Sequence, residues 1–99
     1  PDISWLQEPE GGLSNHWLTV PLFKNQAERE KVQQGLLEGG ISCRNTWYPM
    51  HLQPILKAYK VYGGQVSEDL FQRGLCIPSG WHLSETDEQK ISDSILKRL

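Results

Sequence analysis

Residues 41–54 read Ile-Ser-Cys-Arg-Asn-Thr-Trp-Tyr-Pro-Met-His-Leu-Gln-Pro, a run that alternates at first and is then broken by a proline. The alternation predicts a β-strand over residues 41–47, because successive side chains of a strand point to opposite faces. One face carries Ile41, Cys43, Asn45 and Trp47, and the other carries Ser42, Arg44, Thr46 and Tyr48. The first face is expected to meet the core. The second is polar, so it is expected to look at a ligand or at another domain.

Pro49 ends this strand, since proline cannot donate to a strand ladder. Between Arg44 and Pro54 the chain gathers a cation, two aromatic residues, an imidazole and two amides. Loops that carry so many interactive side chains are commonly binding loops. We therefore expect something to bind around this segment. A short helical turn is expected from Pro54 to Tyr59, ending before Gly63.

Two strands and a helix are predicted upstream of this segment. The short β-prone run at residues 3–7 is expected to pair with a longer strand over residues 13–23. Asn25 offers an N-cap, and Glu28 three residues later completes a pair that resembles a capping box. The helix is expected to run to about Glu38, because the glycines at positions 39 and 40 suit a left-handed stop.

Downstream, the pattern predicts a helix, a short strand and a final helix. Ser67 is the expected N-cap of the first helix, with Val66 packing on Phe71 as a hydrophobic staple and a glycine at position 74 ending it. The strand is expected at residues 75–78. For the last helix, Ser84 and Asp87 form a capping box. Its apolar stripe is expected to contain Ile91, Ile95 and Leu99.

The expected order of elements is therefore β-β-α-β-α-β-α. Hairpins mixed with single crossovers favour an α+β fold with a small mixed or antiparallel sheet and helices packed on one face. A chain of 99 residues is expected to form a single domain over residues 1–99.

Bulk composition excludes some classes of function. The formal net charge is −2 and no block of basic residues occurs, so we expect no nucleic-acid partner. No apolar run is long enough for a membrane helix, and no signal peptide is visible at the start. Cys43 and Cys76 lack a CxxC spacing. They are expected to be buried thiols of a cytoplasmic protein, the alternative being a disulfide or metal pair.

The segment from Arg44 to Pro54 resembles the "Arg-x-x-Trp-x-Pro-Met-His-Leu-Gln-Pro" signature of the DegT/DnrJ/StrS family of aminotransferases. The resemblance continues through residues 66–80, and Ser14-Asn15-His16-Trp17-Leu18 is similar to the family's Ser-Asn-x-Trp-Leu. The family consists of fold-type I enzymes that depend on pyridoxal phosphate. The resemblance implies that the 99 residues are the C-terminal small domain of a longer enzyme.

What the resemblance implies for the longer protein is specific. It would move an amino group, from glutamate, onto a 4-keto-6-deoxy sugar linked to UDP, in a glycan or protein-glycosylation pathway. It would act as a homodimer. The cofactor lysine belongs to the large domain, so the fragment is expected to hold neither catalytic nor cofactor-binding residues and to be inactive alone.

The resemblance assigns substrate binding to Arg44, Trp47, Tyr48, His51, Gln53 and Asn15. Arg44 is suited to a phosphate or carboxylate, the alternative being a salt bridge to the neighbouring domain. His51 could donate to a diphosphate or sugar oxygen, or be a structural histidine. Trp47 and Tyr48 could flank a sugar or base, although plain packing is the alternative for Trp47.

For the remaining positions the alternatives stay equally open. Gln53 could bond a sugar hydroxyl or only the backbone, and Asn15 is equally a turn residue. Ser79 could contact substrate or belong to a simple turn. Without the resemblance, the chain would be a small α+β ligand-binding or protein-interaction module. A metal site from Cys43, His51, Cys76 and His82 is conceivable on ligand type alone, but its spacing matches no finger pattern.

Overall fold

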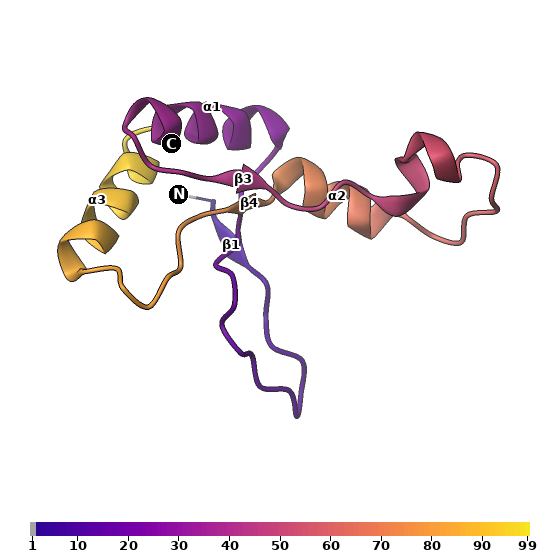
Figure 1. The fold of residues 1–99 in the computed structure, drawn as a ribbon, viewed down its shortest axis with the longest axis horizontal. Helices are drawn as coiled ribbons and strands as arrows, with labels where there is room; N and C mark the ends of the chain where they lie inside the picture. The colour runs from indigo at the N-terminus through magenta and orange to yellow at the C-terminus, as the bar shows by residue number, and fades with distance from the viewer. Residues whose placement is uncertain (1) are drawn as a thin grey trace.

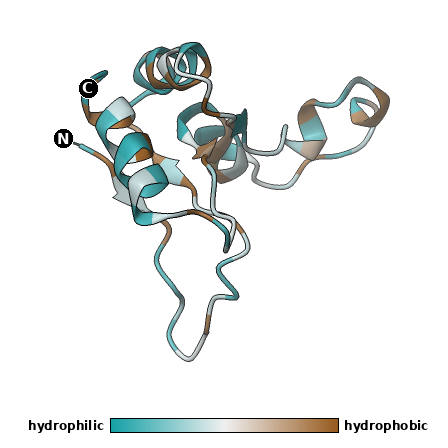
Figure 2. Ribbon diagram, turned by 60° about the vertical axis from the view of Figure 1, so that its left-hand side comes forward, coloured by the Kyte–Doolittle hydropathy of each residue, from teal (hydrophilic) through white to brown (hydrophobic). Residues whose placement is uncertain are grey.

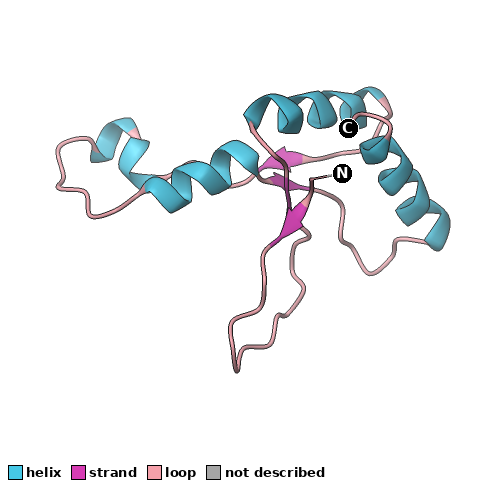
Figure 3. Ribbon diagram, turned by 180° about the vertical axis from the view of Figure 1, so that it is seen from behind, coloured by secondary structure: helices cyan, strands magenta, loops and turns pink. Residues whose placement is uncertain are grey.

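The computed structural model describes residues 2–99, and these form an α+β fold, as predicted (Figures 1 and 3). The elements in chain order are β1 (Ser4–Trp5), β2 (Pro21–Leu22), α1 (Gln26–Glu38), β3 (Arg44–Asn45), the 3-10 helices η1 (Met50–Leu52) and η2 (Pro54–Leu56), α2 (Gln65–Arg73), β4 (Leu75–Cys76) and α3 (Glu85–Leu96). β1 pairs antiparallel with β2, and β3 with β4. Isolated antiparallel bridges, Thr19 with Ile77 and Leu22 with Gly74, join the two pairs.

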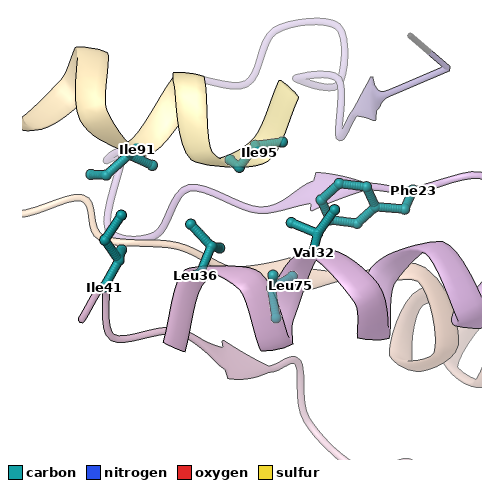
Figure 4. Close-up of a cluster of buried hydrophobic side chains, with 7 residues drawn as sticks. All are labelled: Phe23, Val32, Leu36, Ile41, Leu75, Ile91 and Ile95. Atoms are coloured by element: carbon teal, nitrogen blue, oxygen red, sulfur yellow. The ribbon is translucent and has the colours of Figure 1, made fainter. Parts of the chain in front are cut away.

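The core lies where α1 and α3 cover these strands (Figure 4). Its buried apolar side chains come from both strands and helices: Phe23, Val32, Leu36, Ile41, Leu75, Ile91 and Ile95. Figure 2 shows hydrophilic residues along much of α3. Removing this apolar surface from water is the main force holding the helices against the strands.

The predicted helix starts at residues 25 and 84 are confirmed. The Asn25 Oδ1 accepts a hydrogen bond from the Glu28 N–H at 2.9 Å, and the Glu28 carboxylate accepts one from the Lys24 N–H. The Ser84 and Asp87 side chains form a reciprocal capping box. Side-chain caps of this kind satisfy N–H groups that the first turn of a helix leaves unpaired.

The prediction of a long strand over residues 13–23 is wrong. Only Pro21 and Leu22 form β2, and residues 6–18 project from the body as an extended loop (Figure 1). Local side-chain bonds compete with a ladder here. The Ser14 Oγ accepts from the His16 N–H, and the Asn15 Oδ1 accepts from the Trp17 N–H. The strands predicted at residues 3–7, 41–47 and 75–78 are likewise shortened to β1, β3 and β4.

The start predicted for the helix that ends at residue 74 is also wrong. α2 begins at Gln65, with Gly64 as N-cap at φ +109°, and Ser67 lies within its first turn. Glycine takes this left-handed conformation without the penalty that a Cβ would bring. Val66 is therefore inside the helix and exposed, and it cannot form the predicted staple.

The apolar stripe predicted for the last helix is only partly correct. Ile91 and Ile95 are buried in α3, but Leu99 lies beyond the helix and is 37% exposed. The buried stripe of α3 therefore contains two of the three predicted residues. None of the helices in residues 2–99 is long and apolar enough to span a bilayer.

Arg29 is buried, although the sequence pattern did not single it out; its exposed fraction is 4%. Its Nε donates to the Gln72 carbonyl at 3.1 Å, and its Nη1 donates to Gln33 and to the Asn45 Oδ1. One α1 side chain thus ties α1 to the end of α2 and to β3. These charge-assisted bonds fix the strand that carries Arg44.

Candidate functional site

An open groove of about 590 Å3 runs beside β3 and β4. It is bounded by the extended segment before β2, by β3 with its flanks, and by β4 with the residues that follow. The lining residues are Trp17, Leu18, Ser42 to Trp47, and Cys76 to Ser79. The groove therefore joins three parts of the chain that are distant in sequence.

Two indoles form one wall of this groove. The ring centroids of Trp17 and Trp47 are 5.8 Å apart, and the planes meet at 42°. Both side chains remain largely exposed, at 69% and 65%. The Ser79 Oγ donates to the Trp17 carbonyl at 3.3 Å, which holds the indole-bearing loop against the chain after β4.

The exposure of Trp47 corrects the assignment of its face to the core. Ile41 is buried and Cys43 is partly buried, as the alternation predicted, but β3 ends at Asn45. Because its partner β4 has only two residues, the pleat does not continue to position 47. Alternation assigns a face only as far as a strand is paired.

Arg44 lies on β3 opposite Cys76 and is exposed to the groove. The other three arginines, Arg29, Arg73 and Arg98, each form an ion pair with a carboxylate. Among residues 2–99 the Arg44 guanidinium forms none. The groove therefore presents a planar cation that is free to bind an anion.

Both cysteines line the same groove and are free thiols. Burial raises the pKa of the Cys76 thiol, and the charge of Arg44 opposes part of that shift. Burial also raises the pKa of the Cys43 thiol. Thiols of raised pKa are poor nucleophiles at neutral pH, so the cysteines contribute packing rather than reactivity. Residues 2–99 contain no group of three or more side chains placed to hold a metal ion.

The predicted site residue His51 lies outside the groove, in η1. Its Nε2 is 2.6 Å from the Glu68 Oε1 of α2, and the His51 side chain is 18% exposed. The imidazole also covers Gly64, where an added Cβ would lie 2.8 Å from its Cε1. The structure thus brings His51 to the start of α2 and does not place it beside Arg44 in the groove.

The other three predicted residues make local contacts. The Tyr48 ring packs edge-on against Phe71, with centroids 5.2 Å apart. The Gln53 Nε2 lies 3.3 Å from the Met50 sulfur, and Asn15 holds the turn that leads to Trp17. Of the six predicted residues, Arg44 and Trp47 line the groove. Trp17 and Ser79 join them, and the family-like motifs around each were the signal that pointed to them.

The chain has six lysines, and every one of them is exposed. None lines the groove. Formation of a Schiff base with pyridoxal phosphate needs a lysine held against the cofactor, commonly in a desolvated pocket. The residues present therefore do not fit a complete pyridoxal-phosphate site.

Comparison with known proteins identifies the family of the chain. A model of the DegT/DnrJ/EryC1/StrS aminotransferase family matches residues 3–96. The chain belongs to this family. It is 34% identical over 98 residues to EpsN of Bacillus subtilis (strain 168), provisionally named a pyridoxal phosphate-dependent aminotransferase. It is 29% identical over 89 residues to the GDP-perosamine synthase of Escherichia coli O157:H7.

A solved structure of a family member has the same fold. The fold matches a DegT/DnrJ/EryC1/StrS aminotransferase from Brucella abortus with a TM-score of 0.82 and 31% identity over 96% of the chain. The matches cover 95% and 90% of this chain but only 25% of EpsN, 24% of the perosamine synthase and 26% of the Brucella protein. The 99 residues thus span about a quarter of the length of these family members.

Proposed function

We propose that these residues are the C-terminal domain of a cytoplasmic, pyridoxal phosphate-dependent sugar aminotransferase. The longer protein would transfer an amino group from glutamate to a 4-keto-6-deoxy sugar on UDP, as a homodimer, in glycan or protein-glycosylation biosynthesis. The family match over residues 3–96 supports the reaction class. A relative named GDP-perosamine synthase supports a nucleotide-linked sugar as substrate, although its own nucleotide is GDP.

In this proposal the chain binds and orients substrate, and the rest of the protein supplies the lysine. The observation that carries the proposal is the unpaired Arg44 in a groove walled by two indoles. A guanidinium presents a rigid fork of donors that matches phosphate oxygens. Pyridoxal phosphate, when bound, would supply the electron sink for amino transfer.

The first test compares cofactor labelling of the 99-residue chain with that of the longer protein. The 99-residue chain is incubated with pyridoxal phosphate, reduced with borohydride and examined by mass spectrometry. We expect no stoichiometric labelling, because all six lysines are exposed. The longer protein, treated identically, is expected to label at one lysine outside these residues. Stoichiometric labelling of one lysine within the 99 residues would contradict the proposal.

The second test concerns His51 in the longer protein. His51 lies outside the groove and contacts Glu68, so it bonds the substrate's diphosphate only if the rest of the longer protein brings the substrate to η1. Losing such a charge-assisted hydrogen bond costs roughly 1.5–3 kcal/mol. His51→Ala is therefore expected to raise the KM for the nucleotide sugar about ten- to a hundredfold. Cofactor absorbance and the half-reaction with glutamate are expected to stay unchanged.

Glu68→Gln is the matched control, because it removes the charge that faces His51 and keeps the side-chain shape. If His51 contacts substrate, Glu68→Gln should raise the KM less than His51→Ala does. A His51→Ala protein that loses cofactor or stability while its KM is unchanged would make His51 a structural residue.

A further inference from the structure

We propose that Arg29 is a positioning residue for the groove: its buried guanidinium holds the short ladder of β3 and β4 in register, so that Arg44 faces the groove. The role of Arg44 in binding an anion rests on the proposed function. The link between Arg29 and β3 rests only on contacts within these 99 residues.

The ladder of β3 and β4 is too short to fix its own register. It consists of two residue pairs, Arg44 with Cys76 and Asn45 with Leu75. A two-stranded ladder by itself is at best marginally stable in water, and a slip of one residue would move Arg44 to the opposite face. Neither residue of β3 is apolar, so β3 has no side chain of its own to bury in the core. Contacts from outside the ladder are therefore needed to hold β3 in place.

The Arg29 guanidinium supplies such contacts on both sides of the ladder. Its Nη1 donates to the Asn45 Oδ1 at 3.1 Å, and its Nε donates at 3.1 Å to the carbonyl of Gln72, at the end of α2 just before β4. Because successive side chains of a strand point to opposite faces, holding Asn45 toward α1 leaves Arg44 on the other face. Arg44 is indeed exposed and lines the groove.

The choice of arginine for this buried position fits a role in register. Arg29 is 4% exposed and is the one buried charged side chain among residues 2–99. Buried charges contribute little net stability, and their best-attested use is to specify register. A guanidinium is a rigid fork of donors that bonds Asn45 and Gln72 in fixed directions, whereas a lysine ammonium is a single point on a flexible stem.

The experiment uses the longer protein and has two readouts. Calorimetry measures its affinity for inorganic diphosphate, and mass spectrometry measures amide hydrogen exchange at β3. Arg29→Met removes the fork and keeps much of the apolar volume, and Arg29→Lys keeps the charge without the fork. Gln33→Leu is the matched control, because Gln33 accepts from the same Nη1 at 2.8 Å but belongs to α1 and lies outside the groove.

The variants are expected to separate positioning from charge and from stability. Arg29→Met should weaken diphosphate binding about ten- to a hundredfold, as if the bonds from Arg44 were lost, and should speed exchange at β3. Arg29→Lys should lose nearly as much, while Gln33→Leu should bind as the parent protein does. In an Arg44→Gln background, Arg29→Met should cause no further loss, because Arg29 acts through Arg44.

A compensating pair tests the contact with β3 directly. Asn45→Asp combined with Arg29→Lys places a carboxylate opposite an ammonium, which can replace the lost tie between α1 and β3. This double variant should recover diphosphate affinity to within a few-fold of the parent protein. A residue that only stabilised the fold would not give this pattern, since affinity is measured on folded protein.

Several outcomes would overturn the inference. A folded Arg29→Met protein with parent-like diphosphate affinity and β3 exchange would make Arg29 a stabilising residue only. Equal losses in Gln33→Leu would do the same, and full affinity in Arg29→Lys would show that charge alone matters. If Arg29→Met does not fold, Arg29→Lys decides by the same two readouts.

Failure of the proposed function would look different. A parent protein that does not bind diphosphate would contradict the anion-binding role of Arg44, and exchange at β3 would then decide the inference on Arg29. In that case parent-like exchange at β3 in the Arg29 variants would overturn it. The borohydride labelling is independent of both readouts.

Discussion

Phe23→Ala is expected to lower the free energy of unfolding by about 3–5 kcal/mol, the usual cost of removing a buried aromatic ring. Phe23 is fully buried and lies in the core between α1 and α3 (Figure 4). Its backbone N–H and carbonyl both bond to Arg73, and alanine keeps those bonds. The loss therefore measures the ring's packing alone. Urea titration monitored by circular dichroism measures this change in the free energy of unfolding.

Phe71→Ala is the matched control, since Phe23 and Phe71 are the two phenylalanines of the chain. Phe71 is only partly buried and meets Tyr48 edge to face at the surface of α2. Its removal should cost about 1–2 kcal/mol, an aromatic-pair contribution together with a small area term. Equal losses in the two variants would show that the core does not centre on Phe23.

Arg29→Ala is expected to lower the free energy of unfolding by roughly 3 kcal/mol, because several charge-assisted hydrogen bonds are lost together. The Gln72 carbonyl and the Asn45 side chain each lose a donor, in a region that water reaches poorly. Because Arg29 holds Asn45, the neighbour of Arg44 in β3, its loss should also make β3 more mobile. Urea titration measures the first effect, and faster amide exchange at β3 measures the second.

Arg98→Ala provides the comparison for this prediction. Arg98 also pairs with a carboxylate, that of Glu38, but its side chain is 38% exposed. A surface ion pair of this kind contributes about 1 kcal/mol or less. If Arg29→Ala cost no more than Arg98→Ala, the buried network would not be a determinant of stability.

Features that depend on near neighbours could be predicted from the amino-acid sequence. The caps at Asn25 and Ser84 use partners three residues away, so the local order of residues is enough to specify them. The buried positions Ile91 and Ile95 follow from helical periodicity. The motif from Arg44 to Pro54 also predicted the family, and the family match over residues 3–96 confirmed it.

Features that depend on partners distant in sequence could not be predicted, because they form when the chain packs. A strand lasts as long as another strand pairs with it, so the alternation over residues 13–23 and 41–47 could not give the lengths of β2 and β3. Trp17 and Trp47 are thirty positions apart, and the indoles meet only because the Trp17–Leu18 end of the loop lies beside β3 and β4 in the folded chain. His51 and Glu68 likewise meet only because η1 packs against α2 in the folded chain. Sequence patterns report local hydrogen bonding and periodicity, whereas the groove is made by contacts that form when the whole chain folds.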